Sequence, residues 1–327
     1  MARGHSDLPS TSAPIRLEKS KIFAALARID ASSAARDRVL RMECDFRRRI
    51  DSHISALPAS SAEFRKFNTS PFVLMFYSRQ QGYHHVSQIE KDIIPAKVFS
   101  SMETSAGRMV ETVALPVYGW QAVPSTMHSV ESVIDGCKET NDGTFMAATL
   151  KSGPRCLNDE MAKDIGVDVV THARSWATNH NSQAVEFTYG VLYGTKRQSN
   201  KKDWHILRNM GQVLPSSVEL TESWKNRWSL RYKDDDLVVS ATVRVGIEWW
   251  DYLGDRDTWL EICVSLIRAC VLPANPEAST PNYAIFDLAS IIDTSCLPDD
   301  YNVSLLQRSQ LEWLLFLSRH FCDELVP

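Results

Sequence analysis

One stretch of the chain decides the predicted fold, Val133-Ile-Asp-Gly-Cys-Lys-Glu-Thr-Asn-Asp-Gly-Thr-Phe-Met-Ala-Ala-Thr-Leu-Lys-Ser-Gly153. Inside it, Asn141-Asp-Gly143 is a strong signal for a hairpin turn. Counting back from this turn along both strands places Asp135 roughly opposite Thr149–Lys151, at the ~5 Å spacing of neighbouring strands. Thr149 and Lys151 are two residues apart, so they share a face of their strand. The sequence therefore predicts an aspartate and a lysine together at the edge of a small sheet.

This pair of residue types suits phosphodiester hydrolysis. The carboxylate of Asp135 could hold Mg²⁺ against a scissile phosphate, where the metal lowers the pKa of a bound water. Lys151 beside that water would favour hydroxide and offset the charge that gathers at phosphorus. Aspartate and lysine also flank many surface hairpins, so an ordinary cross-strand ion pair is the competing interpretation.

The segments around the hairpin alternate between helix and strand. Apolar periodicity predicts helices over 17–57, 89–99, 103–115, 158–177, 249–270 and 305–321. Strands are expected at 118–123, 129–135, 144–151 and 185–193. This order favours a mixed α/β core wrapped by terminal helices.

Composition and charge narrow the class of protein. The chain has 327 residues, 44% of them hydrophobic, and a formal net charge of −4. These values are typical of a soluble globular protein of one or two domains. There is no apolar run of ~18–20 residues and no signal-peptide pattern at the N-terminus, so neither a membrane span nor secretion is expected. Seven cysteines without a C-x-x-C pair indicate a reduced, cytoplasmic protein.

Residues 133–153 resemble the active-site hairpin of type II restriction endonucleases of the PD-(D/E)XK superfamily, and are most similar to the subgroup that cuts RGGNCCY. The similarity covers about residues 65–270 and includes Asn68-Thr-Ser-Pro-Phe72, Ile89-Glu-Lys-Asp-Ile-Ile-Pro95, Gly190-Val-Leu-Tyr-Gly194 and Trp249-Trp250. It implies a restriction-endonuclease-like catalytic core at 61–270, with a central mixed sheet flanked by helices. A disordered arm at 1–16, a helical dimerisation or DNA-contacting segment at 17–60 and a C-terminal helical extension at 271–327 complete the expected organisation.

The resemblance assigns roles to individual positions. Asp135 matches the metal-binding aspartate and Lys151 the catalytic lysine. Thr149 stands where the superfamily pattern has Asp or Glu, although the resembled subgroup also has a small hydroxyl residue there. Because a hydroxyl is a poor Mg²⁺ ligand, another acid should complete the site, and Glu111 on the preceding helix is the candidate. The backbone carbonyl of Leu150 is a further expected ligand. The alternatives to Glu111 are Glu90, Asp92 and Glu131.

Basic residues could hold DNA despite the negative net charge, because local clustering decides the field at a cleft. A loop over 194–203 and six arginines between Arg36 and Arg49 form two such clusters. In each case a solvated surface is the alternative interpretation. The predicted DNA contacts are Arg155, Asn158, Lys196, Arg197, Lys201 and Lys202.

The sequence thus predicts a Mg²⁺-dependent type II restriction endonuclease that cuts both strands of a short palindromic site in double-stranded DNA. The expected ends are 5′-phosphate and 3′-hydroxyl, and the resemblance suggests a GGNCC-like interrupted site. A two-fold symmetric site implies a homodimer, with helices 17–57 and 305–321 as the expected interface. A cognate DNA methyltransferase is the expected genetic partner. A repair or structure-specific nuclease and a non-catalytic DNA-binding or assembly protein are the alternatives.

Overall fold

The computed structural model describes residues 12–56, 71–85, 87–123, 133–199, 202–222, 228–271, 291, 293–298 and 301–327. The helices are α1 (Lys19–Ala31), α2 (Ser33–Ala56), α3 (Pro71–Gln81), α4 (Ser87–Val117), α5 (Asp159–Asn179), α6 (Lys202–Val213), α7 (Ile247–Leu253), α8 (Thr258–Cys270) and α10 (Leu311–Ser318), with short 3₁₀ turns η3 (Arg308–Gln310) and η4 (Arg319–Phe321). The strands are β1 (Arg16–Glu18), β2 (Gln121–Ala122), β3 (Gly136–Glu139), β4 (Thr144–Lys151), β5 (Ala184–Val191), β6 (Glu219–Glu222), β7 (Ser229–Asp234), β8 (Leu237–Val245) and β9 (Glu324–Val326).

A mixed sheet of seven strands forms the centre of the fold, in the order β2-β3-β4-β5-β8-β7-β6. The three middle strands, β4, β5 and β8, run parallel, and antiparallel hairpins extend the sheet on both sides. The later residues of β4 and β5 are buried on both faces, as is usual for parallel strands, and these parts of the strands are mostly apolar. The predicted mixed sheet flanked by helices is confirmed.

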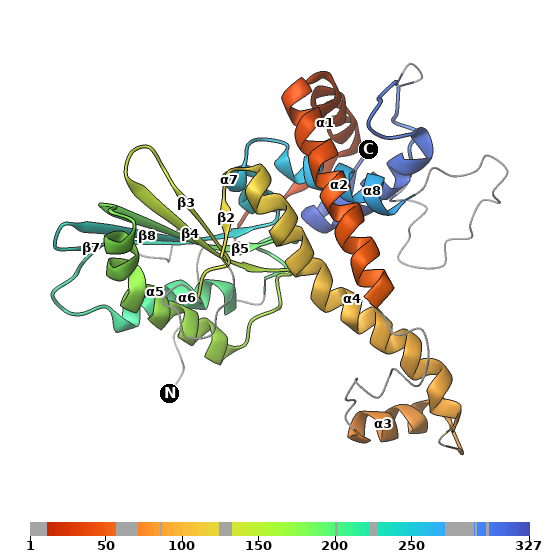
Figure 1. The fold of residues 1–327 in the computed structure, drawn as a ribbon, viewed down its shortest axis with the longest axis horizontal. Coiled ribbons are helices and arrows are strands. Elements are labelled where there is room, and N and C mark those ends of the chain that lie inside the picture. The colour runs from red at the N-terminus through yellow and green to blue at the C-terminus, as the bar shows by residue number, and fades with distance from the viewer. Residues whose placement is uncertain are drawn as a thin grey trace.

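Helices α5 and α6 cover one face of this sheet, and a second group of helices packs at one end of its strands (Figure 1). Alternation along β4 sends Phe145 and Ala147 to one face, where α5 and α6 contribute Trp176 and Leu207 to the same buried cluster. Ala148 and Leu150 point to the other face and join a second cluster with α2, α4, α8 and α10. Since α4 belongs to this second cluster, its packing fixes where its side chains lie relative to the end of β4.

The N- and C-terminal segments are part of the second cluster. Residues 16–18 pair in parallel with residues 324–326, and the Ile15 amide donates to Asp323 at 2.9 Å. Arg16 therefore lies in a strand rather than in the predicted disordered arm, whose residues 1–11 lie outside the described residues. The helix expected over 17–57 is present as two helices, α1 and α2, separated at Ser32, whereas residues 17 and 18 belong to β1 and residue 57 lies outside the described residues.

Several predicted boundaries were wrong. Helices expected at 89–99 and 103–115 are one helix, α4, with Pro95 inside it. The helix expected at 249–270 is divided into α7 and α8 at Gly254, where a Cβ atom would lie 2.5 Å from the Tyr118 ring. The closing helix over 305–321 is reduced to α10 between two 3₁₀ turns.

The strands β6, β7 and β8 were not predicted at all. The acidic run Asp234-Asp-Asp236 is the turn between β7 and β8, and its carboxylates surround Arg174, with the closest contact at 2.9 Å. His84 and His85 are exposed in a loop, as expected. No helix in the described part of the chain is long and apolar enough to cross a membrane.

Candidate functional site

The hairpin of β3 and β4 has the register that its turn predicts. Gly136 is paired with Ala148, and the Asp135 amide donates to the Ala148 carbonyl at 2.8 Å. Asp135 is therefore opposite Thr149, two residues before Lys151. The Leu150 amide donates to the Asp135 carboxylate, Oδ2, at 2.7 Å. This bond fixes the orientation of the carboxylate at the end of β3.

Asp135 and Lys151 lie close enough for their charges to interact. Burial raises the pKa of Asp135, while the Leu150 amide, Lys151 and Arg108 act in the opposite direction. Yet these two described residues form no ion pair at 4.0 Å or less. The ion pair of the competing interpretation is therefore not formed between these two described side chains.

Helix α4 brings Glu111 to the same place. Gly107 touches the chain just after β4 so closely that a Cβ atom on it would lie 2.9 Å from Cβ of Ser152. Glu111 is one helical turn further along. Burial and the negative charge of Asp135 raise the pKa of Glu111 to about 7, while Lys151 and Arg108 oppose the shift. The structure thus brings together the two carboxylates and the lysine named from the sequence.

The raised pKa of Glu111 has a measurable effect on stability. Its folded pKa of about 7 exceeds the ordinary 4.5, so the folded protein holds a proton that the unfolded chain has lost between these values. In EDTA the free energy of unfolding should therefore fall as pH rises from about 4.5 to 7, by at most roughly 3 kcal/mol from this group at ~1.4 kcal/mol per pKa unit. Urea unfolding at both ends of this range would show a shallower pH dependence for Glu111→Gln than for the exposed control Glu160→Gln. Equal slopes would contradict the buried, protonated Glu111.

Thr149 and Leu150 have different surroundings. The Thr149 side chain is 4% exposed, and its hydroxyl donates to the Val133 carbonyl. It therefore ties β4 to the segment before Asp135 and is committed to this backbone contact. In a strand the N–H and C=O of one residue point the same way, so the Leu150 carbonyl faces the Asp135 side, as its amide does.

The alternatives to Glu111 do not reach this place. At 1.5 Å per residue, Glu90 and Asp92 lie about 30 Å along α4 from Glu111. Asp92 instead accepts a hydrogen bond from the Tyr83 hydroxyl. Both are excluded as partners of Asp135, and Glu131 lies outside the described residues.

The carboxylates of Asp135 and Glu111 are the described groups that could hold a divalent metal ion at this place. No group of three or more His, Cys, Asp or Glu side chains that could hold a metal occurs among the described residues. Mg²⁺, by contrast, usually keeps several waters and takes only one or two carboxylates. Asp135 and Glu111 fit that requirement, because two buried like charges are stabilised by a cation between them.

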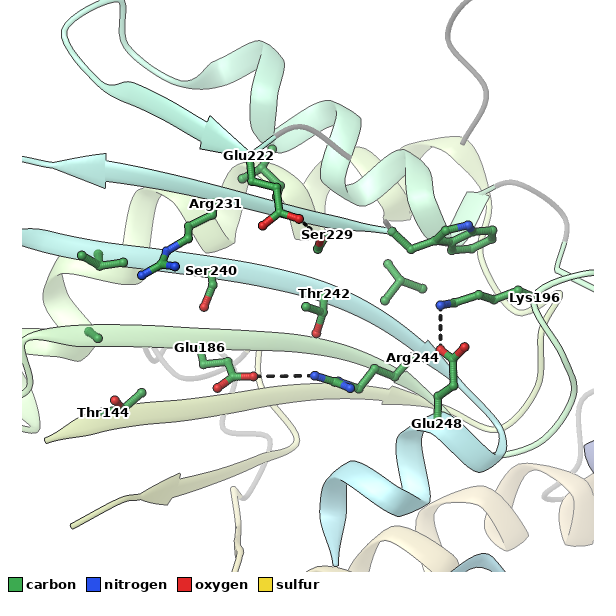
Figure 2. Close-up of a pocket in the computed structure, with 15 residues that line it drawn as sticks. Thr144, Glu186, Lys196, Glu222, Ser229, Arg231, Ser240, Thr242, Arg244 and Glu248 are labelled. Carbon is green, nitrogen blue, oxygen red and sulfur yellow. Dashed lines mark hydrogen bonds and ion pairs between the residues drawn. The ribbon is translucent and has the colours of Figure 1, made fainter. Parts of the chain in front are cut away.

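Several residues predicted to contact DNA instead form contacts within the chain. Figure 2 shows the Lys196 ammonium paired with Glu248, at 2.7 Å, on a polar face of the sheet. Lys196 also lies 5.3 Å from the centre of the Trp228 ring. Lys202 pairs with Asp159, and the Asn158 side chain caps α5 by accepting from the Met161 amide at 2.7 Å. These three contacts stabilise the fold, which the sequence prediction did not anticipate.

Two other residues predicted to contact DNA, Arg155 and Arg197, are exposed. Arg155 follows the active-site strand and is exposed, with its Nε donating to the Gln198 carbonyl at 3.4 Å. Arg197 is also exposed, whereas Lys201 lies outside the described residues.

The sequence reasoning missed one buried polar group next to the site. Asp203 is 0% exposed and accepts hydrogen bonds from the hydroxyls of Ser199 and Tyr189. Burial raises the pKa of Asp203 to about 6. Tyr189 is in register with Thr149 and also interacts with the charge of Asp135. This network supports the strand beneath the hairpin, and only the three-dimensional pairing of β4 with β5 reveals it.

Comparison with known protein families gives an independent indication. Residues 74–222 match the model of the family described as type II restriction endonuclease EcoO109I. The matched region extends from α3 to β6 and contains Glu111, Asp135, Thr149 and Lys151. No curated protein matches the chain. The family match supports a type II restriction endonuclease, and hence a nuclease with a DNA substrate.

Proposed function

We propose that the chain is a Mg²⁺-dependent restriction endonuclease of the PD-(D/E)XK superfamily that hydrolyses both strands of a short palindromic DNA site. The observation that carries this proposal is the convergence of Glu111, Asp135 and Lys151 at the end of β4, inside the matched region. A GGNCC-like interrupted site remains the expected target, on the resemblance alone.

Asp135 and Glu111 are the residues that would hold Mg²⁺, with the Leu150 carbonyl as a further oxygen ligand. When bound, the metal supplies Lewis acidity at the scissile phosphate and lowers the pKa of a water. The Leu150 amide keeps the Asp135 carboxylate in one orientation before substrate arrives. Thr149 acts as a positioning residue through its bond to the Val133 carbonyl.

Lys151 acts on the attacking water and on the phosphate. Its ammonium donates hydrogen bonds that orient the water and offset the negative charge that develops on the phosphoryl oxygens. The water oxygen forms a bond to phosphorus and releases a proton to the solvent, and the bond from phosphorus to the 3′ oxygen breaks. The 3′ oxygen takes up a proton, so the products are a 3′-hydroxyl and a 5′-phosphate.

A homodimer would place two such sites on the two strands, and we propose for it an interface other than the expected terminal helices. The helices α1, α2 and α10 contribute Leu26, Val39, Leu314 and other side chains to the core of a single chain. Helix α3 projects away from that core with the first half of α4 (Figure 1). Its Phe72 and Phe76 are 72% and 74% exposed, and Phe99 on α4 is 71% exposed. A helix that is apolar on several sides is normally buried, so this arm is the surface that we assign to a second copy.

The proposed function also implies a genetic partner, a DNA methyltransferase. A nuclease that cuts a short site would also cut its host's DNA, so a methyltransferase that modifies the same site is the expected genetic partner. Its gene next to the gene for this chain would support restriction over repair.

A plasmid digest by the purified protein tests the function. Incubation with Mg²⁺, with EDTA as the matched control, should give discrete fragments whose sequenced ends share one palindrome. Smears or cleavage only at junctions would indicate a repair or structure-specific nuclease instead. Intact DNA with every divalent metal would contradict catalysis and leave a DNA-binding or assembly protein.

A further inference from the structure

A basic groove lies between α2 and α4, close to the carboxylates. Arg48, Arg49 and His53 line it from α2, and Ser105, Arg108 and Thr112 line it from α4. Ser105, Arg108 and Thr112 are spaced three and four residues apart on α4 and share one face, and Arg49 and His53 are four residues apart on α2, which packs against α4. The groove has a volume of about 770 Å³, which is room for an extended ligand rather than a single ion.

The charge of the groove is one-sided. Among the residues that the structure describes, three arginines and one histidine line it, and no aspartate or glutamate does. The polar hollow on the sheet offers a comparison, since Lys196, Arg231 and Arg244 are matched there by Glu186, Glu222 and Glu248 (Figure 2). Of these two hollows, the one between α2 and α4 therefore has the surplus of positive charge that attracts an anion.

The hydrogen-bonding groups of the groove are incompletely used. The ring nitrogen Nε2 of His53 is buried and has no hydrogen-bond partner among the described residues. Arg48 pairs with Asp45 at 2.6 Å, but its side chain remains 71% exposed. For Arg49 the described part of the chain provides no ion pair. An anion with several oxygen acceptors would satisfy these groups.

Arg108 connects the groove to the catalytic carboxylates. Its positive charge lowers the pKa of both Glu111 and Asp135, against the effect of burial. Arg108 and Glu111 are three residues apart, so they are neighbours on the surface of α4. In a DNA strand the charges follow one another every ~3.4 Å along the axis. A strand with its scissile phosphate at Asp135 would thus present its neighbouring phosphates to the groove.

We propose that the groove between α2 and α4 binds the phosphodiester backbone of the DNA strand that enters the active site, through Arg48, Arg49, His53 and Arg108. This inference rests on the proposed function, since it assumes that the carboxylates receive a DNA strand. It also selects one end of the arginine-rich helix as the binding surface, rather than the basic loop at 194–203.

Binding of duplex DNA in EDTA, measured by fluorescence anisotropy between about 50 and 200 mM salt, tests the groove without cleavage. The double variant Arg48→Ala/Arg49→Ala should bind about 10-fold more weakly. Its slope of log K against log salt should be smaller by about 1–2, because each phosphate contact contributes about 0.9. The loss should be the same for random sequences, since phosphate contacts carry no sequence information. Arg256→Ala/Arg308→Ala, two exposed arginines outside the groove, is the matched control and should keep the wild-type slope.

Each other outcome is decisive. Wild-type affinity and slope in the groove variant, or an equal loss in the control, would overturn the inference. A wild-type protein that binds no duplex would overturn both this inference and the proposed function. Cleavage by wild type in Mg²⁺ is measured in parallel. If the wild type cleaves DNA and the groove variant binds DNA as well as the wild type, the inference about the groove is wrong and the proposed function stands. If the groove variant binds DNA more weakly but the wild type does not cleave DNA, the proposed nuclease function is wrong and the inference about the groove stands.

Discussion

Replacing Asp135 with Asn should reduce DNA cleavage by about 10³-fold or more, while the protein stays folded and still binds DNA. The amide is nearly isosteric with the carboxylate, and its oxygen can still accept the hydrogen bond from the Leu150 amide at the end of β3. What is lost is the negative charge that would hold the metal. Lys151→Ala should cause a comparable loss of cleavage, because it removes the positive charge that would offset the negative charge developing on the phosphate.

The controls for this experiment are an aspartate and a lysine elsewhere on the surface. Asp164→Asn lies on an exposed position of α5, and Lys233→Ala lies on β7, three places from β4 in the sheet. Initial cleavage rates in Mg²⁺, thermal unfolding and DNA binding in EDTA should be measured for all four variants. Near wild-type cleavage by Asp135→Asn or Lys151→Ala would show that the hairpin is not the catalytic centre.

Phe76→Asp should convert a dimer into a monomer and abolish concerted cutting of the two strands. Phe72, Phe76 and Phe99, at about 150–250 Å² per aromatic side chain, together expose roughly 300–500 Å². That is a large part of the ~800 Å² that each partner buries in a standard interface. A buried unpaired carboxylate at this position costs several kcal/mol, which is enough to shift a micromolar dimer to monomer.

Trp313→Asp separates this interface from the one expected from the sequence. Trp313 is the exposed apolar residue of α10, at 44%, and α10 was assigned to the dimer interface on helical pattern alone. Sedimentation of wild type and both variants over a range of concentrations gives the result directly. If Trp313→Asp is a monomer and Phe76→Asp is a dimer, the interface lies at the terminal helices, as expected from the sequence. If the wild type is a monomer, the proposed dimer is wrong.

The hairpin could be predicted because its determinants are local. Asn141-Asp-Gly143 fixes the turn, and alternation then fixes the face of every residue back to Asp135. The position of Glu111 is different in kind. It depends on the contact between Gly107 and Ser152, two residues far apart in the sequence, and only the resemblance suggested that helix.

The terminal helices and the basic loop show where sequence patterns are ambiguous. An amphipathic pattern shows that a helix face is buried, but the pattern is the same whether the cover is this chain or a second copy. The face of α2 that carries Val39 and Met42 is covered by the chain itself. A lysine in a basic loop likewise reveals nothing of its partner, and that of Lys196 is Glu248, on a helix after the last strand of the sheet.

The pairing of β1 with β9 affects when the candidate site can assemble during synthesis of the chain. Residues 16–18 have no partner strand until residues 324–326 have left the ribosome, because only β9 pairs with β1 in the described structure. The helices α1 and α2 share their core with α8 and α10, and α4 packs on α2. A nascent chain that already contains Asp135 and Lys151 therefore lacks the scaffold that holds Glu111 beside them. Assembly of the site that brings Glu111 beside Asp135 and Lys151 is in this way postponed until residues 324–326 have been synthesised.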